Sequence, residues 1–76
     1  MENEYNVVDI NGIEYTEIDR VNDNGRIYVL LSNLDNNKDF CIKLLINENG
    51  VEYLDALSDR EEFHKAFKLF ADAIMN

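Results

Sequence analysis

The sequence predicts an α+β fold, a five-stranded antiparallel β-meander followed by one C-terminal amphipathic helix packed on one face of the sheet. Two observations indicate this fold. Turn signals recur at nearly even spacing, with Asn-Gly at 11–12, 24–25 and 49–50 and Asn-Asn at 36–37. After Ser58 the hydrophobic period changes from two residues to the ~3.6 residues of a helix. At 76 residues the chain is long enough for one small domain, 1–76.

The four turns divide residues 5–54 into five strands. Asn-Gly is the strongest short-range hairpin signal, because both residues tolerate the positive φ that a type I′ turn requires. Asn-Asn enters that region less readily. Two-residue turns also fix the register, so that Asp23 faces Arg26 and Asp35 faces Lys38, each an opposite-charge cross-strand pair. We place the strands at 5–10, 13–21, 26–32, 38–47 and 51–54.

This register assigns the apolar residues to two faces of the sheet. The better apolar face collects Ile27, Val29, Leu31, Phe40, Ile42, Leu44, Ile46 and Tyr53. The second face collects Tyr28, Leu30, Cys41, Lys43 and Leu45. Because Ile18 is out of phase with Ile13 and Tyr15, we expect a β-bulge near Glu17 that returns all three to one face.

The segment 59–75 has the pattern of an amphipathic helix. Ser58 and Glu61 form a capping box, in which each side chain accepts a hydrogen bond from a backbone N–H at the start of the helix. The apolar stripe consists of Phe63, Ala66, Phe67, Phe70 and Ile74. We expect the helix to lie across the better apolar face, in a two-layer arrangement.

Charge and hydropathy disfavour several classes of partner. The net charge of −9 repels phosphate backbones and anionic lipids, so we expect neither nucleic-acid nor membrane binding. No apolar run approaches the ~20 residues that span a bilayer, and the first residues lack the features of a secretory signal. The single cysteine fits a reducing compartment, so we expect a cytoplasmic protein.

Candidate chemical groups are few. His64 is the only histidine, and we interpret it as a surface residue on the flank of the helix, with no orienting carboxylate or nucleophile motif beside it. Cys41 is the only cysteine and is interpreted as a small buried or half-buried hydrophobe. The stretch "DRVNDNG" fails the EF-hand pattern, since Arg20 stands where an acid is needed. We therefore expect no enzyme, no cofactor and no metal site, although spacing does not exclude a Cys41–His64 pair.

Three segments in order carry a family resemblance: "NVVDINGIEYTEI", "GRIYVLLSNLD" and "FCIKLLINENGVEYLDALSDREEFHKAFKLF". Together they resemble the YrzB-like family of short acidic bacterial proteins of unknown function. The chain departs from that family in having fewer acids in the helix and more asparagine in the turns. The resemblance implies a fold and leaves activity open. The matching residues are Gly12 and Glu14, Gly25 with Tyr28 and Leu31, Glu52, Tyr53 and Leu54, and Asp59 with Glu61 and Glu62.

Geometry then suggests a function. Five strands at ~4.8 Å spacing make a sheet about 20 Å wide, which one helix about 10–12 Å across cannot cover on both faces. The second face, with Tyr28, Leu30 and Leu45, is therefore the predicted interaction face for a homodimer or a protein partner, unless the sheet curls enough to bury it. The favoured function is a non-enzymatic protein-interaction or regulatory module. Two alternatives stay open: a small enzyme or ligand binder using carboxylates with Cys41 or His64, and a nucleic-acid mimic.

Overall fold

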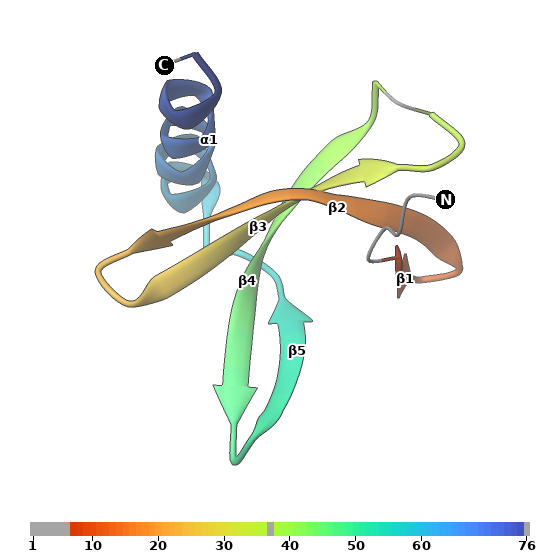
Figure 1. The fold of residues 1–76 in the computed structure, drawn as a ribbon, viewed down its shortest axis with the longest axis horizontal. Helices are drawn as coiled ribbons and strands as arrows, with labels where there is room; N and C mark the ends of the chain where they lie inside the picture. The colour runs from red at the N-terminus through yellow and green to blue at the C-terminus, as the bar shows by residue number, and fades with distance from the viewer. Residues whose placement is uncertain (1–6, 37, 76) are drawn as a thin grey trace, which may run out of the picture.

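The predicted α+β architecture is confirmed by the computed structural model, which describes residues 7–36 and 38–75 (Figure 1). All strands pair antiparallel with their neighbours along the chain, in the order β1-β2-β3-β4-β5, which is a meander. The predicted start of the first strand, Tyr5, lies outside the described residues. The elements are β1 (Val7–Ile10), β2 (Ile13–Asp23), β3 (Arg26–Asn33), β4 (Phe40–Glu48), β5 (Val51–Asp55) and α1 (Arg60–Met75).

The three Asn-Gly turns are confirmed. Each asparagine has a φ of 55° and each glycine a φ between 83° and 92°, as a type I′ turn requires. Each glycine N–H also donates to a side chain three residues earlier, at 2.9, 3.0 and 3.2 Å. The acceptors are the Oδ1 atoms of Asp9, Asn22 and Asn47. The recurring turn signal therefore begins with an Asp or Asn two residues before Asn-Gly.

The predicted two-residue turn at 36–37 is wrong. Strand β3 ends at Asn33 and strand β4 begins at Phe40, so the connection is wider than a two-residue turn. Asn33 N–H closes this wider loop by donating to the Asp39 carbonyl at 2.9 Å. Asn36 Oδ1 accepts from the Lys38 N–H at 3.1 Å inside this loop, so Lys38 does not pair with Asp35 as a cross-strand residue. Asn37 itself lies outside the described residues. A tight turn here would lack the glycine that tolerates positive φ without steric cost, and asparagine side chains stabilise the wider loop instead.

The wider loop shifts the β3–β4 register by one residue. Leu30 pairs with Ile42 and Leu31 with Cys41, whereas the two-residue turn would have paired Leu31 with Ile42. Because side chains alternate across a strand, a one-residue shift moves every side chain to the opposite face relative to its partner strand. The predicted composition of the two faces is therefore wrong.

The register of β2 against β3 is confirmed. Asp23 pairs with Arg26, and the register shifts between Glu17 and Asp19, which makes Ile18 the bulged residue. The expected consequence of the bulge is wrong, however. Tyr15 shares a face with Leu31, whereas Ile18 lies toward the helix.

The core has two parts, one on each face of the sheet. On the helix side, Ala66 and Phe70 pack on Tyr28, Leu30 and Ile42. On the opposite side, Val29 and Leu31 are 1% and 0% exposed although no helix covers them. Figure 1 shows the strong twist of the sheet, and residues of both edge strands, β1 and β5, line one hollow on that side. Curling of the sheet, which the sequence left open as an alternative, therefore buries Val29 and Leu31, which the prediction had placed on the face under the helix.

The helix begins one residue later than the predicted capping box. Asp59 is the N-cap, and its Oδ1 accepts from the Glu62 N–H at 2.9 Å. Glu62 Oε1 in turn accepts from Ser58 N–H at 2.8 Å and from Ser58 Oγ at 2.9 Å. Asp caps a helix as well as Ser does, so the N-cap is Asp59 rather than Ser58, and the carboxylate that accepts from Ser58 is that of Glu62 rather than Glu61.

Candidate functional site

An open apolar groove of ≈ 290 Å³ lies between α1 and the strands beside it. The floor is formed by Leu30, Ile42 and Phe70, all of which are buried. The walls come from three elements, since β2, β4 and α1 each contribute exposed side chains. The wall residues are Ile18, Phe40, Phe63, Phe67 and Ala71.

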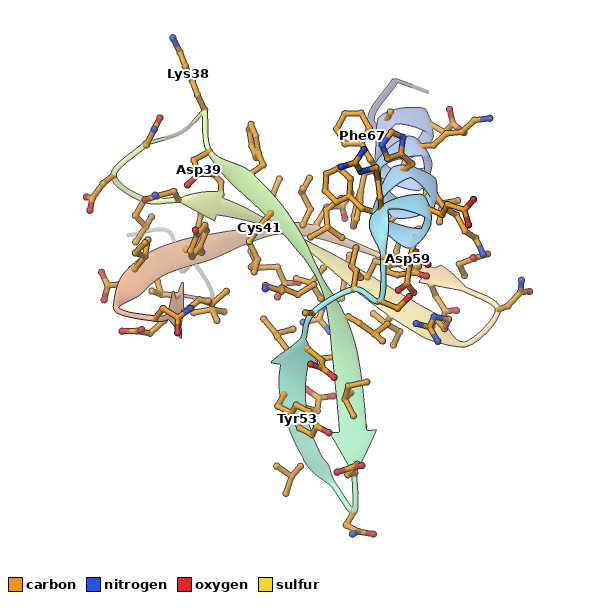
Figure 2. All side chains as sticks on the ribbon, turned by 180° about the vertical axis from the view of Figure 1, so that it is seen from behind. Lys38, Asp39, Cys41, Tyr53, Asp59 and Phe67 are labelled. Carbon is orange, nitrogen blue, oxygen red and sulfur yellow. The ribbon has the colours of Figure 1, made fainter. Side chains whose placement is uncertain are left out.

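The walls of the groove leave large apolar side chains in water. Phe40, Phe63 and Phe67 are 55%, 41% and 58% exposed, and Ile18 is 51% exposed. Since a phenylalanine has ~150–250 Å² to bury, the three rings leave roughly 300 Å² of aromatic surface in one patch. The rings of Phe63 and Phe67 stack with centroids 6.2 Å apart. Figure 2 shows Phe67 on the side of α1 that faces the beginning of β4. A contiguous apolar patch of this size on a small protein is often functional.

The groove stays open because α1 is fixed to the sheet along its other flank. The hydroxyl of Tyr28 donates to Glu62 Oε2 at 2.9 Å, and Arg26 Nη2 donates to the same oxygen. Lys65 Nζ forms an ion pair with Asp23 Oδ2 at 2.9 Å. These contacts tie one flank of the helix to the β2–β3 hairpin, and the flank with Phe63 and Phe67 is left beside the groove.

Glu62 is the electrostatic centre of this attachment. Hydrogen bonds, first from the Ser58 backbone N–H and then from Ser58 Oγ, Tyr28 and Arg26, lower the pKa of Glu62 from 4.5 to about 2, against an opposing effect of burial. The charged carboxylate is therefore the form that the fold stabilises.

The apolar stripe of α1 is wider than the face that it buries. Ala66 and Phe70 are buried and Leu69 packs against them, whereas Phe63 and Phe67 extend past the contact. The remaining member of the predicted stripe, Ile74, has its side chain outside the described residues. The stripe predicted the helix, but it could not show which part of the apolar surface would stay exposed.

The predicted interaction face is not formed. Tyr28 and Leu30 are 1% and 8% exposed and lie in the core under α1. Leu45 pairs with Ile27 and Leu54 on the opposite side of the sheet and is half-buried there. The structure separates these three residues because of the one-residue register shift between β3 and β4.

A second hollow lies on the concave side of the sheet, where Leu45 is found. Its lining mixes apolar residues such as Val8, Val29 and Leu54 with charged ones. Arg20 Nε and Nη2 donate to Glu17 Oε2 and Oε1 at 2.6 and 2.9 Å, a bidentate pair within this lining. Its charged groups can be hydrated or paired with each other.

The structure does not bring Cys41 and His64 into one cavity. Cys41 borders the groove but pairs with Leu31, and strand alternation directs its thiol to the concave side. Burial raises the pKa of this thiol, so little reactive thiolate is present at neutral pH. His64 is exposed, contacts the Phe63 ring edge-to-face at 6.1 Å, and lies in a shallow depression with Arg60 and Glu61.

The described residues contain neither a metal-binding cluster nor a membrane-spanning helix. Within 7–36 and 38–75, no group of three or more His, Cys, Asp or Glu side chains is placed to hold a metal ion. The helix of this described part is neither long nor apolar enough to cross a membrane.

Comparison with known proteins gives one informative similarity. The chain is 39% identical over 59 residues to a UPF0473 protein of Heliobacterium modesticaldum. This similarity points to a small uncharacterised family. The alignment covers 75% of this chain and 66% of that relative, so the chain spans just under two thirds of the relative's length. No family model and no solved structure matches the chain.

Proposed function

We propose that the protein is a non-enzymatic protein-interaction module whose binding surface is the groove between α1 and the sheet. One observation carries the proposal: roughly 300 Å² of aromatic surface surrounds a hollow of ≈ 290 Å³. At ~25 cal/mol per Å², covering this surface contributes on the order of 7 kcal/mol before the costs of association.

The chemistry of the groove favours a protein over a small ligand. Small-molecule sites combine an apolar lining with a few convergent polar groups that orient the ligand. The side chains that line this groove are aliphatic or aromatic, apart from Cys41, whose thiol is directed to the other side of the sheet. Exposed phenylalanines around an apolar centre are instead typical of the core of a protein–protein interface.

The proposal relocates the interaction surface that the sequence predicts. A homodimer or a protein partner remains the proposed occupant, but the surface is the groove, because Tyr28 and Leu30 are buried. We also propose that this chain belongs to the YrzB-like family, because the three segments that resemble that family occur in the same order. A cytoplasmic location, supported by the single cysteine, and a regulatory role belong to the same proposal.

Capture with matched baits tests this function. The native chain, Phe67→Ser and Tyr53→Ser would each be immobilised and exposed to cell extract supplemented with untagged copies of the chain. Tyr53 is a suitable control because it is 44% exposed on β5, far from Phe67 (Figure 2). We expect at least one protein to bind the native and Tyr53→Ser baits and to be lost from Phe67→Ser. Circular dichroism checks that all three baits are folded, and identical binding to the three would contradict the proposal.

A further inference from the structure

We infer that the groove is filled by a second copy of this chain, an inference that rests on the proposed function. The first argument is shape. A two-fold interface uses the same surface on both partners, so that surface must be complementary to itself, for example through a hollow and a side chain that fills it. Here the hollow lies directly beside the ring of Phe67, which is 58% exposed on its wall.

The distribution of charge also favours contact through α1. Arg60–Met75 contains three acidic and three basic residues, so the helix is neutral. The other 60 residues contain thirteen acidic and four basic residues, which account for the whole net charge of −9. Two copies that meet through their sheets would bring like charges together, whereas copies that meet through α1 avoid most of this repulsion.

A basic line on α1 narrows the choice of partner. Arg60 and Lys68, which form this basic line, are exposed and lie two four-residue steps apart, next to the line of Phe63 and Phe67 that borders the groove. A strongly basic partner would be repelled by this line, and a strongly acidic partner would be repelled by the acidic remainder of the protein. A second copy avoids both kinds of repulsion, because the acidic sheet of one copy can lie against the basic line of the other.

The size of the patch fits the core of a dimer interface. A standard interface buries ~800 Å² per partner, about one seventh of the 5860 Å² surface of this chain. The roughly 300 Å² of aromatic surface would form the apolar centre, and the basic line with the facing sheet would form the polar rim. Phe67 of each copy would then be the central anchor.

Sedimentation velocity over a range of concentrations tests the inference on the purified full chain. We expect the native chain and Tyr53→Ser to form a reversible dimer. In Phe67→Ser the dissociation constant should rise about 30-fold or more, the effect of removing a central aromatic anchor. Lys68→Glu should weaken the dimer by a smaller factor, because it reverses one charge of the basic line. Both residues are exposed, so the variants are expected to fold, which circular dichroism would verify.

The outcomes separate this inference from the proposed function. If the native chain stays monomeric at every concentration, the inference that a second copy fills the groove is overturned. If Phe67-dependent capture of another protein persists in that case, the proposed function stands. A dimer that Phe67→Ser leaves intact also overturns the inference, and unchanged capture by that variant would overturn the proposed function as well.

Discussion

The helix-side groove and the concave hollow lie on opposite sides of one sheet and differ in what they expose to water. The groove exposes the rings of Phe40, Phe63 and Phe67, and the concave hollow presents the Glu17–Arg20 pair beside its apolar residues. Water can satisfy the charged groups of the second hollow, but only another apolar surface relieves the cost of hydrating the first. A binding surface is therefore indicated by the part of an apolar face that stays exposed after folding, rather than by the total apolar content of that face.

The largest expected effect tests whether the two sides stabilise the fold equally. Phe70→Ala, under α1, should lower the free energy of unfolding by about 3–5 kcal/mol, and Leu31→Ala, on the concave side, by about 2–5 kcal/mol. Both side chains are at most 2% exposed, so each substitution leaves a cavity. Urea denaturation measures both losses. A loss below 1 kcal/mol for Leu31→Ala would mean that curling does not build a second core.

The attachment of α1 gives a pH-dependent effect of intermediate size. Since the pKa of Glu62 is lowered to about 2 from 4.5, its contribution to stability is complete above pH 4.5 and is lost as the pH falls toward 2. Glu62→Gln should destabilise the protein at neutral pH by about 1–2 kcal/mol, because the hydrogen bonds from Ser58, Tyr28 and Arg26 lose a charged acceptor. Urea denaturation at a series of pH values should show the native and variant curves converging below pH 4.5. A gap that is independent of pH would show that the charge of Glu62 is not what holds the helix.

The Glu17–Arg20 ion pair of the concave hollow should contribute less to stability than the contacts of Glu62 do. Arg20→Gln removes the bidentate contact with Glu17, but the Arg20 side chain is 46% exposed and already hydrated. We expect the free energy of unfolding to fall by less than about 1 kcal/mol, as for most exposed ion pairs. Thermal denaturation followed by circular dichroism is a sufficient measurement. A larger loss would make this hollow a structural centre and weaken the contrast with the Glu62 attachment.

The smallest effect on stability is expected at the groove itself. Phe67→Ser removes an exposed ring, so the free energy of unfolding should change by no more than about 0.5 kcal/mol while association is lost. Tyr53→Ser serves as the matched control, and we expect it to change neither the free energy of unfolding nor the association. If Phe67→Ser unfolds the protein, the ring belongs to the core and the groove is not a free surface.

Local chemistry explains how much of this fold could be predicted from the sequence. The Asn-Gly turns depend only on the φ preferences of two residues, and the bulge at Ile18 followed from a break in phase, so both were predictable. The Asp or Asn two residues before each turn, as at Asp9 and Asn22, is a further local signal of the same turns.

The candidate site was not predictable in the same way. Its composition depends on the loop after Asn33, where side-chain hydrogen bonds outweigh the simplest turn and shift the register by one residue. The side on which the groove opens depends on Glu62 contacting Arg26 and Tyr28, more than 30 residues away in sequence. Hydrophobic periodicity identifies an apolar face but contains no information on such distant partners.

Aromatic NMR spectra of the native chain, recorded in a dilution series and then with any captured partner, test most directly that the groove is the association surface. We predict that signals of Phe40, Phe63 and Phe67 shift with dilution or with the added partner, while those of Tyr53 and Tyr15 stay in place. Signals of the groove rings that do not move while Tyr53 does would contradict it, because association would then use another face of the molecule.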